Sequence, residues 1–222
     1  MKTKILKIKG DWQEVVNDCR ATVGKEAIGK EPSHEWKQKI LISEHSPIRD
    51  IVVKLKWSGI PYWVAMHWKT HKWESRTISQ RNDRQEKYDR NKAPQDTPVD
   101  FIGEPNVQHL IDTMRKRLCF QASPETREYA EDLKLAIHEV QPEIADVLIP
   151  TCVYRAGCPE LLQQGKKCVF YETMCNKHPD FASTDLQKRY DAYNQCFYSR
   201  YAKGRQDTKG EETDEPKEAC KV

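Results

Sequence analysis

The chain has 222 residues, enough for one large domain or two small ones. Its 37 basic and 34 acidic residues leave a formal net charge of +3, which is too balanced to favour duplex DNA binding through charge alone. The sequence has no run of about 18 apolar residues and no apolar signal-peptide region at its start. We therefore expect a cytoplasmic protein that contacts neither membrane nor duplex nucleic acid.

Two stretches, residues 3–9 and 51–57, alternate apolar with mainly basic side chains, as half-buried strands do, and Ser58-Gly59 then predicts a turn. Six stretches combine a capping residue or an N-terminal proline with apolar residues at helical spacing. These predicted helices begin at Asp11, Ser33, Pro61, Pro105, Ser123 and Thr184.

Between and after these elements lie segments without clear periodicity. Residues 82–100 are almost wholly polar and predict an exposed loop. Residues 150–183 are punctuated by Cys, Pro and Gly and predict irregular structure, and the charged residues 204–222 predict a disordered tail. Without a repeat or a linker, the sequence favours a single α+β domain: a core over 1–149, followed by a Cys-rich segment and a final helix over 150–203.

Eight cysteines occur, at positions 19, 119, 152, 158, 168, 175, 196 and 220. In a reducing compartment they are expected to be thiols or metal ligands rather than disulfides. Their number allows a tetrahedral zinc site built from Cys152, Cys158, Cys168 and Cys175, with His178 as an alternative ligand. The spacings lack the usual Cys-x-x-Cys knuckle, so we interpret these residues as buried structural thiols and predict no metal.

The stretch with the most chemistry is 44–84, where imidazole, ammonium and guanidinium groups fall within one strand–helix–loop unit. Such groups suit a ligand that carries phosphates and flat rings. They occur in three clusters: Glu44–Arg49, Pro61–Lys72 and Ser79–Arg81.

The order of these clusters resembles that of the flavin-dependent thymidylate synthases, the ThyX family. That family has a His-Ser/Thr-Pro-type turn, a strand, an Arg-His-Arg helix end and a Ser-x-Arg. Its later motifs are an Asn-rich helix ending in Arg, and an Ala-Gln-x-Glu segment. The matching residues here are Cys19–Thr22 at the end of the first helix, His45-Ser46-Pro47, Thr70-His71-Lys72, Ser79-Gln80-Arg81, Asn106–Asp112, Arg117 and Ala122–Glu125. The resemblance covers residues 1–145.

The chain also departs from the family pattern. Thr70 and Lys72 stand where the family has arginines, and lysine cannot make a bidentate fork. The Ser-x-Arg arrives one residue early, Thr77 replaces a glutamate, and a helical excursion is reduced to a polar stretch. The chain therefore looks like a divergent relative.

The resemblance implies an antiparallel sheet flanked by helices, in a homotetramer with active sites at subunit interfaces. It implies one-carbon transfer from methylenetetrahydrofolate to C5 of a pyrimidine deoxynucleotide, with FAD as hydride carrier and NADPH as reductant. The simplest reaction converts dUMP to dTMP. Hydroxymethylation of dUMP or dCMP, and a non-catalytic nucleotide-binding relative, remain open, as does a viral origin with action in a host cytoplasm.

By the same resemblance, the flavin contacts are Thr22, His45, Ser46, Thr70, His71, Lys72, Asn106, Gln108 and Asp112. The nucleotide contacts are His67, Trp68, Ser79, Gln80, Arg81 and Arg117. Arg117 is the catalytic candidate, because a guanidinium beside the pyrimidine would stabilise negative charge on N3 and O2. Structural alternatives are a helix-end cap for His45, a helix-start residue for Asn106 and an exposed charge for Arg117.

Overall fold

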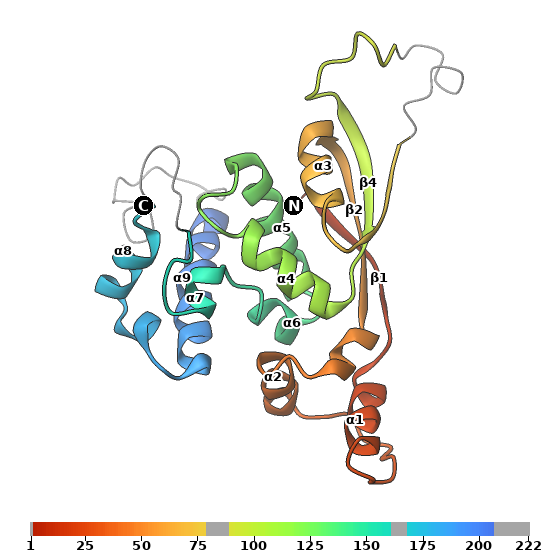
Figure 1. Ribbon diagram of the computed structural model, residues 1–222, viewed down its shortest axis with the longest axis vertical. Coiled ribbons are helices and arrows are strands. Elements are labelled where there is room, and N and C mark those ends of the chain that lie inside the picture. Colours follow the sequence, from red (N-terminus) through yellow and green to blue (C-terminus); the bar gives the residue numbers. More distant parts are fainter. Residues whose placement is uncertain (1, 79–88, 161–167, 207–222) are drawn as a thin grey trace.

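The computed structural model describes residues 2–78, 89–160 and 168–206. A four-stranded sheet runs along one side of the molecule, and helices cover one of its faces (Figure 1). Every neighbouring pair of strands is antiparallel. The sheet order is β1 (Thr3–Lys9), β2 (Val52–Pro61), β4 (Pro98–Glu104) and β3 (Glu74–Thr77). The expected antiparallel sheet flanked by helices is confirmed.

The two faces of the sheet differ in chemistry because side chains alternate along each strand. Val53, Leu55 and Trp57 of β2 are completely buried under the helices. The intervening lysines face the other side, where Lys54 pairs with Glu104 at 2.8 Å and Lys56 pairs with Asp100 at 2.6 Å. The outward face of β4 therefore carries two ion pairs with lysines of β2.

The helices begin close to the predicted capping residues. Asp11 accepts from the backbone N–H of Glu14 at 2.8 Å, and the hydroxyls of Ser33 and Ser123 cap their helices in the same way. The helices are α1 (Trp12–Ala21), α2 (His34–Ile42), η1 (Ser46–Asp50), α3 (Tyr62–Lys69), α4 (Val107–Arg117), α5 (Pro124–His138), α6 (Pro142–Asp146), α7 (Thr151–Tyr154), α8 (Phe170–Lys177), η3 (Pro179–Ala182) and α9 (Leu186–Gln206).

Several predicted boundaries are wrong. The expected turn at Ser58-Gly59 lies inside β2, which absorbs it as an irregularity in the pairing with β4. Pro61 precedes α3 rather than opening it. Asn106, not Pro105, caps α4, because its side chain accepts from the backbone N–H of His109 at 2.8 Å.

Further differences concern segments that were expected to lack regular structure. The predicted loop 82–100 overlaps the start of β4 at Pro98, and β3 was not predicted. The segment 150–183 contains α7 and α8 rather than being wholly irregular. Asp185 instead of Thr184 accepts from the first turn of α9, at 2.9 Å from the N–H of Gln187.

The predicted tail lies outside the described residues from position 207 onward, and α9 continues to Gln206. Within the described ranges, none of the helices is long and apolar enough to cross a lipid bilayer.

A cluster of aromatic rings joins the sheet to α3, α4 and α5. The Trp57 ring centroid lies 4.8 Å from that of Trp68 and 5.3 Å from that of Phe101. Trp73, which follows α3, also packs here and donates its indole N–H to the Thr113 hydroxyl of α4 at 3.0 Å. This contact fixes the segment between α3 and β3 against α4, which positions the candidate site.

A fully buried lysine ties the C-terminal helix α9 to α5 and α6. The ammonium group of Lys134 donates to the Ala145 carbonyl at 2.5 Å and to the Asn194 side-chain oxygen at 2.8 Å. It also lies 5.2 Å from the ring centroids of Phe197 and Tyr198. Burial lowers the pKa of Lys134 to about 7.

Candidate active site

A cavity of about 890 Å³ lies between α4, α7 and the segment that follows α3. Its walls come from parts of the chain that are distant in sequence. Six of the nine predicted flavin contacts line it: Thr70, His71, Lys72, Asn106, Gln108 and Asp112. The cavity also includes residues that were not singled out from sequence: Arg49, His109, Thr113, Arg115, Lys116, Thr151, Tyr154 and Arg155.

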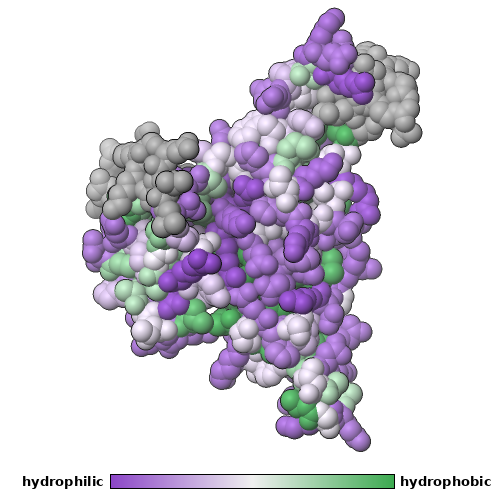
Figure 2. Space-filling model, in the orientation of Figure 1, coloured by the Kyte–Doolittle hydropathy of each residue, from purple (hydrophilic) through white to green (hydrophobic). Residues whose placement is uncertain are grey.

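The lining of this cavity is predominantly basic. Arg49, Lys72, Lys116 and Arg155 contribute cations from four separate segments, whereas Asp112 is the carboxylate among its lining residues. Figure 2 shows that the face carrying α4 is largely hydrophilic. Cationic side chains that converge on one cavity favour an anionic ligand such as a phosphate.

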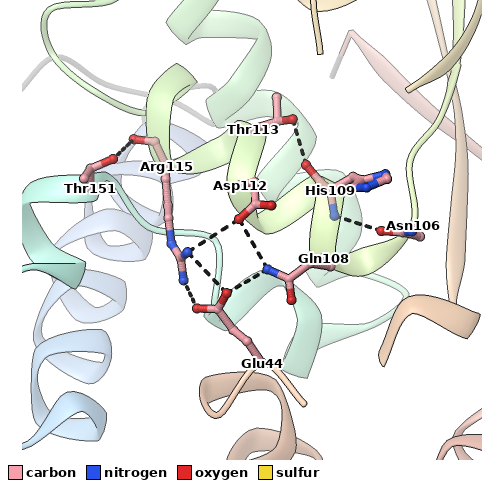
Figure 3. A network of polar contacts seen from close by, with 8 residues as sticks. All are labelled: Glu44, Asn106, Gln108, His109, Asp112, Thr113, Arg115 and Thr151. Carbon is pink, nitrogen blue, oxygen red and sulfur yellow. Dashed lines mark hydrogen bonds and ion pairs between the residues drawn. The ribbon is translucent and has the colours of Figure 1, made fainter. Parts of the chain in front are cut away.

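A polar network fixes one wall of the cavity (Figure 3). The Glu44 carboxylate points toward α4, where it pairs with the guanidinium of Arg115 and accepts from the amide of Gln108 at 2.7 Å. The Gln108 amide also lies 3.3 Å from Asp112. Glu44 adopts a left-handed backbone conformation, with a φ of 51°.

Arg115 is held from a second side as well, because its guanidinium carbon lies 3.7 Å from the ring centroid of Tyr154. Its charge is thus compensated by Glu44 and stacked on an aromatic ring. Arg115 is therefore a fixed part of the wall. The cations that remain to bind a ligand are Arg49, Lys72, Lys116 and Arg155. Sequence reasoning quoted Glu44 but gave it no role, and it missed Arg115.

Arg117, the last residue of α4, reaches the segment after α3. Its Nε–H donates to Nε2 of His71 at 2.8 Å, and its Nη2 donates to the His67 carbonyl at 2.7 Å. The Thr70 hydroxyl lies 3.5 Å from the same Nη2. The structure therefore brings Arg117 together with three of its predicted companions.

Burial and two neighbouring cations determine the protonation state of the His71 imidazole. Burial, together with the charges of Arg117 and Lys116, lowers the pKa of His71 to about 4, so the ring is neutral at pH 7. Because Nε2 accepts a hydrogen bond, we assign the proton to Nδ1. His71 therefore orients the guanidinium as an acceptor and does not repel it.

The other two residues predicted near the nucleotide on α3 have different surroundings. The His67 imidazole lies with Nδ1 3.0 Å from the Thr126 hydroxyl, and burial followed by the charge of Arg117 lowers its pKa. Trp68 is completely buried in the aromatic cluster, so its ring is not accessible from the cavity. Its expected role as a nucleotide contact therefore stays a prediction.

Three predicted flavin contacts do not line the cavity. Thr22, His45 and Ser46 are exposed near the end of α1, where the Thr22 hydroxyl donates to the Cys19 carbonyl at 2.7 Å. The His45 imidazole lies 3.6 Å from the Cys19 sulfur. Arg49 is the residue of η1 that reaches the cavity.

The predicted nucleotide contacts Ser79, Gln80 and Arg81 lie outside the described residues. Their roles as nucleotide contacts stay predictions.

The cysteines of the C-terminal segment are divided by the fold. Cys152, Cys158 and Cys168 line a second cavity, of about 460 Å³, together with Cys119 from the end of α4. Cys175 lies on α8 and is not part of that lining. Across the described ranges, no three His, Cys, Asp or Glu side chains are close enough in their present conformations to hold a metal ion.

Comparison with known proteins gives a match in structure only. No family model and no curated protein sequence matches the chain. The flavin-dependent thymidylate synthase ThyX from Helicobacter pylori, complexed with FAD and dUMP, superposes with a TM-score of 0.55 at 12% identity. That match covers 67% of this chain and 100% of the other.

A second solved structure, the UMP/dUMP methylase PolB from Streptomyces cacaoi bound with 5-Br dUMP, gives a TM-score of 0.52 at 13% identity. It covers 65% of this chain and 93% of the other. The chain has a ThyX-like fold. At these identities the structural similarity establishes the fold alone. What the cavity binds depends on the residues that line it.

Proposed function

We propose that the chain catalyses flavin-dependent transfer of a one-carbon unit from methylenetetrahydrofolate to C5 of a pyrimidine deoxynucleotide, most simply dUMP to dTMP. The observation that carries this proposal is the bond between Arg117 and neutral His71 beside a basic cavity, in a ThyX-like fold. Two enzymes with that fold were solved with a uracil nucleotide or its bromo analogue.

The donor set of the cavity fits FAD. A volume of about 890 Å³ is in the range of ligand pockets, and Lys72, Lys116 and Arg49 can neutralise a diphosphate. The side-chain amides of Asn106 and Gln108 offer polar partners for a flavin ring system. When bound, FAD would supply the hydride chemistry, with NADPH as reductant, while the protein supplies orientation and charge.

Arg117 has donors to spare for a pyrimidine. Its Nε and Nη2 are occupied by His71 and the His67 carbonyl, whereas Nη1 has no partner in the described part of the chain. A pyrimidine placed against Nη1 would have the negative charge that develops on N3 and O2 stabilised by a fixed guanidinium. Since His71 stays neutral, it holds this orientation without competing for the same anion.

In this proposal, the exposed positions of Thr22, His45 and Ser46 are explained by a neighbouring subunit. In the homotetramer that the resemblance implies, these residues would meet a cavity of another copy rather than their own. Sedimentation of the purified protein tests this assembly: a tetramer is expected, and a monomer at micromolar concentration would contradict it.

The first experiment is a titration of the purified protein with FAD, followed by absorbance near about 450 nm after removal of free flavin. Retained flavin is expected. Incubation with dUMP, methylenetetrahydrofolate and NADPH should then add one methyl group to the nucleotide by mass spectrometry. If the nucleotide gains a hydroxymethyl group instead, the enzyme is a hydroxymethylase. A colourless protein that modifies neither dUMP nor dCMP would overturn the enzymatic proposal.

A further inference from the structure

The second cavity gathers four cysteine sulfurs from three separate segments. Cys119 follows α4, Cys152 lies on α7, and Cys158 and Cys168 flank the two ends of the connection between α7 and α8. In sequence, Cys119 is more than thirty residues from the nearest of the other three. Four thiols in one cavity is an arrangement that packing alone does not require, because a buried thiol serves as a small apolar side chain without sulfur neighbours.

Cys119 and Cys152 each interact electrostatically with Cys158 and Cys168 of the same cavity. Burial, with smaller contributions from Cys119, Cys158 and Cys168, raises the pKa of Cys152 to about 12. Burial also raises the pKa of Cys119, with contributions from Cys168 and Cys158. Cys119 and Cys152 therefore lie in one neighbourhood with Cys158 and Cys168.

Two features of the surroundings favour a thiolate form once a cation is present. The backbone N–H of Gln121 lies 3.5 Å from the Cys119 sulfur as a donor, and such bonds stabilise a thiolate. Basic side chains also line the same cavity and can offset the negative charge of a tetrathiolate centre. They are Arg115, Lys116, Arg117 and Arg155.

We propose that Cys119, Cys152, Cys158 and Cys168 form a tetrathiolate site for Zn²⁺. Binding releases one proton from each thiol to solvent and forms four zinc–sulfur bonds, with no change in oxidation state. The sulfurs are not yet close enough to hold an ion in the described conformation. The ion would draw them together, as is usual for sites whose ligands converge only on metal binding.

This site has a structural role in the fold. Cys119 lies two residues after Arg117, so the ion would tie the end of α4 to the segment that contains α7 and α8. The proposal does not depend on the flavin chemistry, and it replaces the cysteine set expected from spacing, which had Cys175 in place of Cys119.

The experiment measures zinc by mass spectrometry after purification under reducing conditions with added Zn²⁺ and desalting. About one zinc per chain is expected, as four ligands complete a tetrahedral site. Cys158→Ser, at an exposed position, and Cys119→Ser should each lose most of the zinc. The matched control Cys175→Ser should retain it. Substitution with Co²⁺ should give the visible bands of a tetrahedral thiolate centre in the wild-type protein.

Three results would overturn the proposal: no zinc in the wild-type protein, full zinc in both Cys119→Ser and Cys158→Ser, or loss of zinc in Cys175→Ser. Thiol titration without reductant detects disulfides among the four cysteines. Disulfides with no bound metal would also overturn the proposal. Flavin absorbance of the same samples is recorded in parallel, so a failure of the zinc site and a failure of the proposed enzymatic function are distinguished.

Discussion

Two cavities meet along the C-terminal half of α4 and share Arg115, Lys116, Thr151 and Arg155 in their walls. The larger one is lined mostly by nitrogen and oxygen groups, whereas the smaller one adds cysteine sulfurs and aromatic rings to its basic side chains. They also differ in how the chain builds them. Short local motifs supply much of the larger cavity, whereas the smaller one needs Cys119 to meet residues far along the chain. Motif spacing therefore reveals the first and hides the second.

The largest effect, on turnover, is expected at Arg117. This residue lines the smaller cavity and donates a hydrogen bond to His71 of the larger one. Arg117→Ala should lower the turnover number by about 100- to 1000-fold, the usual cost of removing one charge-stabilising donor. FAD absorbance should be retained. Steady-state kinetics with dUMP measures the loss, and a variant that keeps wild-type turnover would remove Arg117 from the mechanism.

The wall between the cavities depends on the Glu44–Arg115 pair, in which both side chains are largely buried. Glu44→Gln should cost about 3 kcal/mol of unfolding free energy, because it leaves a buried guanidinium without its counter-charge. Urea unfolding measures this difference. The control is Glu35→Gln, which removes an exposed pair with Lys39 and should leave stability unchanged. Equal losses in the two variants would contradict a structural role for Glu44.

A smaller effect, on FAD affinity, is expected at Lys72 in the lining of the larger cavity. Lys72→Ala should weaken FAD binding about tenfold, which corresponds to the loss of one charge-assisted contact to a phosphate. Lys69→Ala removes an equally exposed lysine at the end of α3 that does not line the cavity, and binding should be unchanged. Fluorescence titration at two salt concentrations measures both, and matching affinities would place the phosphates elsewhere.

The smallest effect is the pH dependence due to His71. Its pKa is lowered from 6.5 to about 4 in the folded protein, so the unfolded chain takes up the proton first as pH falls. The stabilisation associated with neutral His71 is therefore complete above about pH 6.5 and is lost progressively toward pH 4. Unfolding free energies of the wild type and His71→Gln should diverge over that window, and parallel curves would show that His71 is not buried beside Arg117.

Much of the fold follows from local chemistry. Asp11, Ser33 and Ser123 each cap a helix through their own side chain, so the sequence at the cap is sufficient to place it. Strand β4 was missed because its start belongs to the polar run 82–100, in which Asp100 finds its partner Lys56 only across the sheet. Such pairs form only after the strands are adjacent, and a single stretch of sequence cannot show them.

The same distinction applies to the larger cavity. Thr70, His71 and Lys72 are consecutive, and Asn106, Gln108 and Asp112 belong to α4 and its cap, so the motifs of the family resemblance named all six together. Tyr154 and Arg155 enter from α7, and their part in the cavity is set by packing between distant helices. The Arg117–His71 bond likewise joins residues 46 positions apart, and it was predicted only as a shared site.

The buried ammonium of Lys134 has a consequence for dissecting this protein. Cutting the chain before α9 would remove Asn194, Phe197 and Tyr198 and leave Lys134 with the Ala145 carbonyl as its remaining acceptor among its described partners. A cation left without these partners in an apolar interior is costly, so a shortened chain that ends at residue 185, directly before α9, should fail to yield a folded product. Replacing Lys134 with methionine in that truncated form should recover part of the lost yield of folded protein. That result would show that α9 is needed to stabilise the buried charge of Lys134.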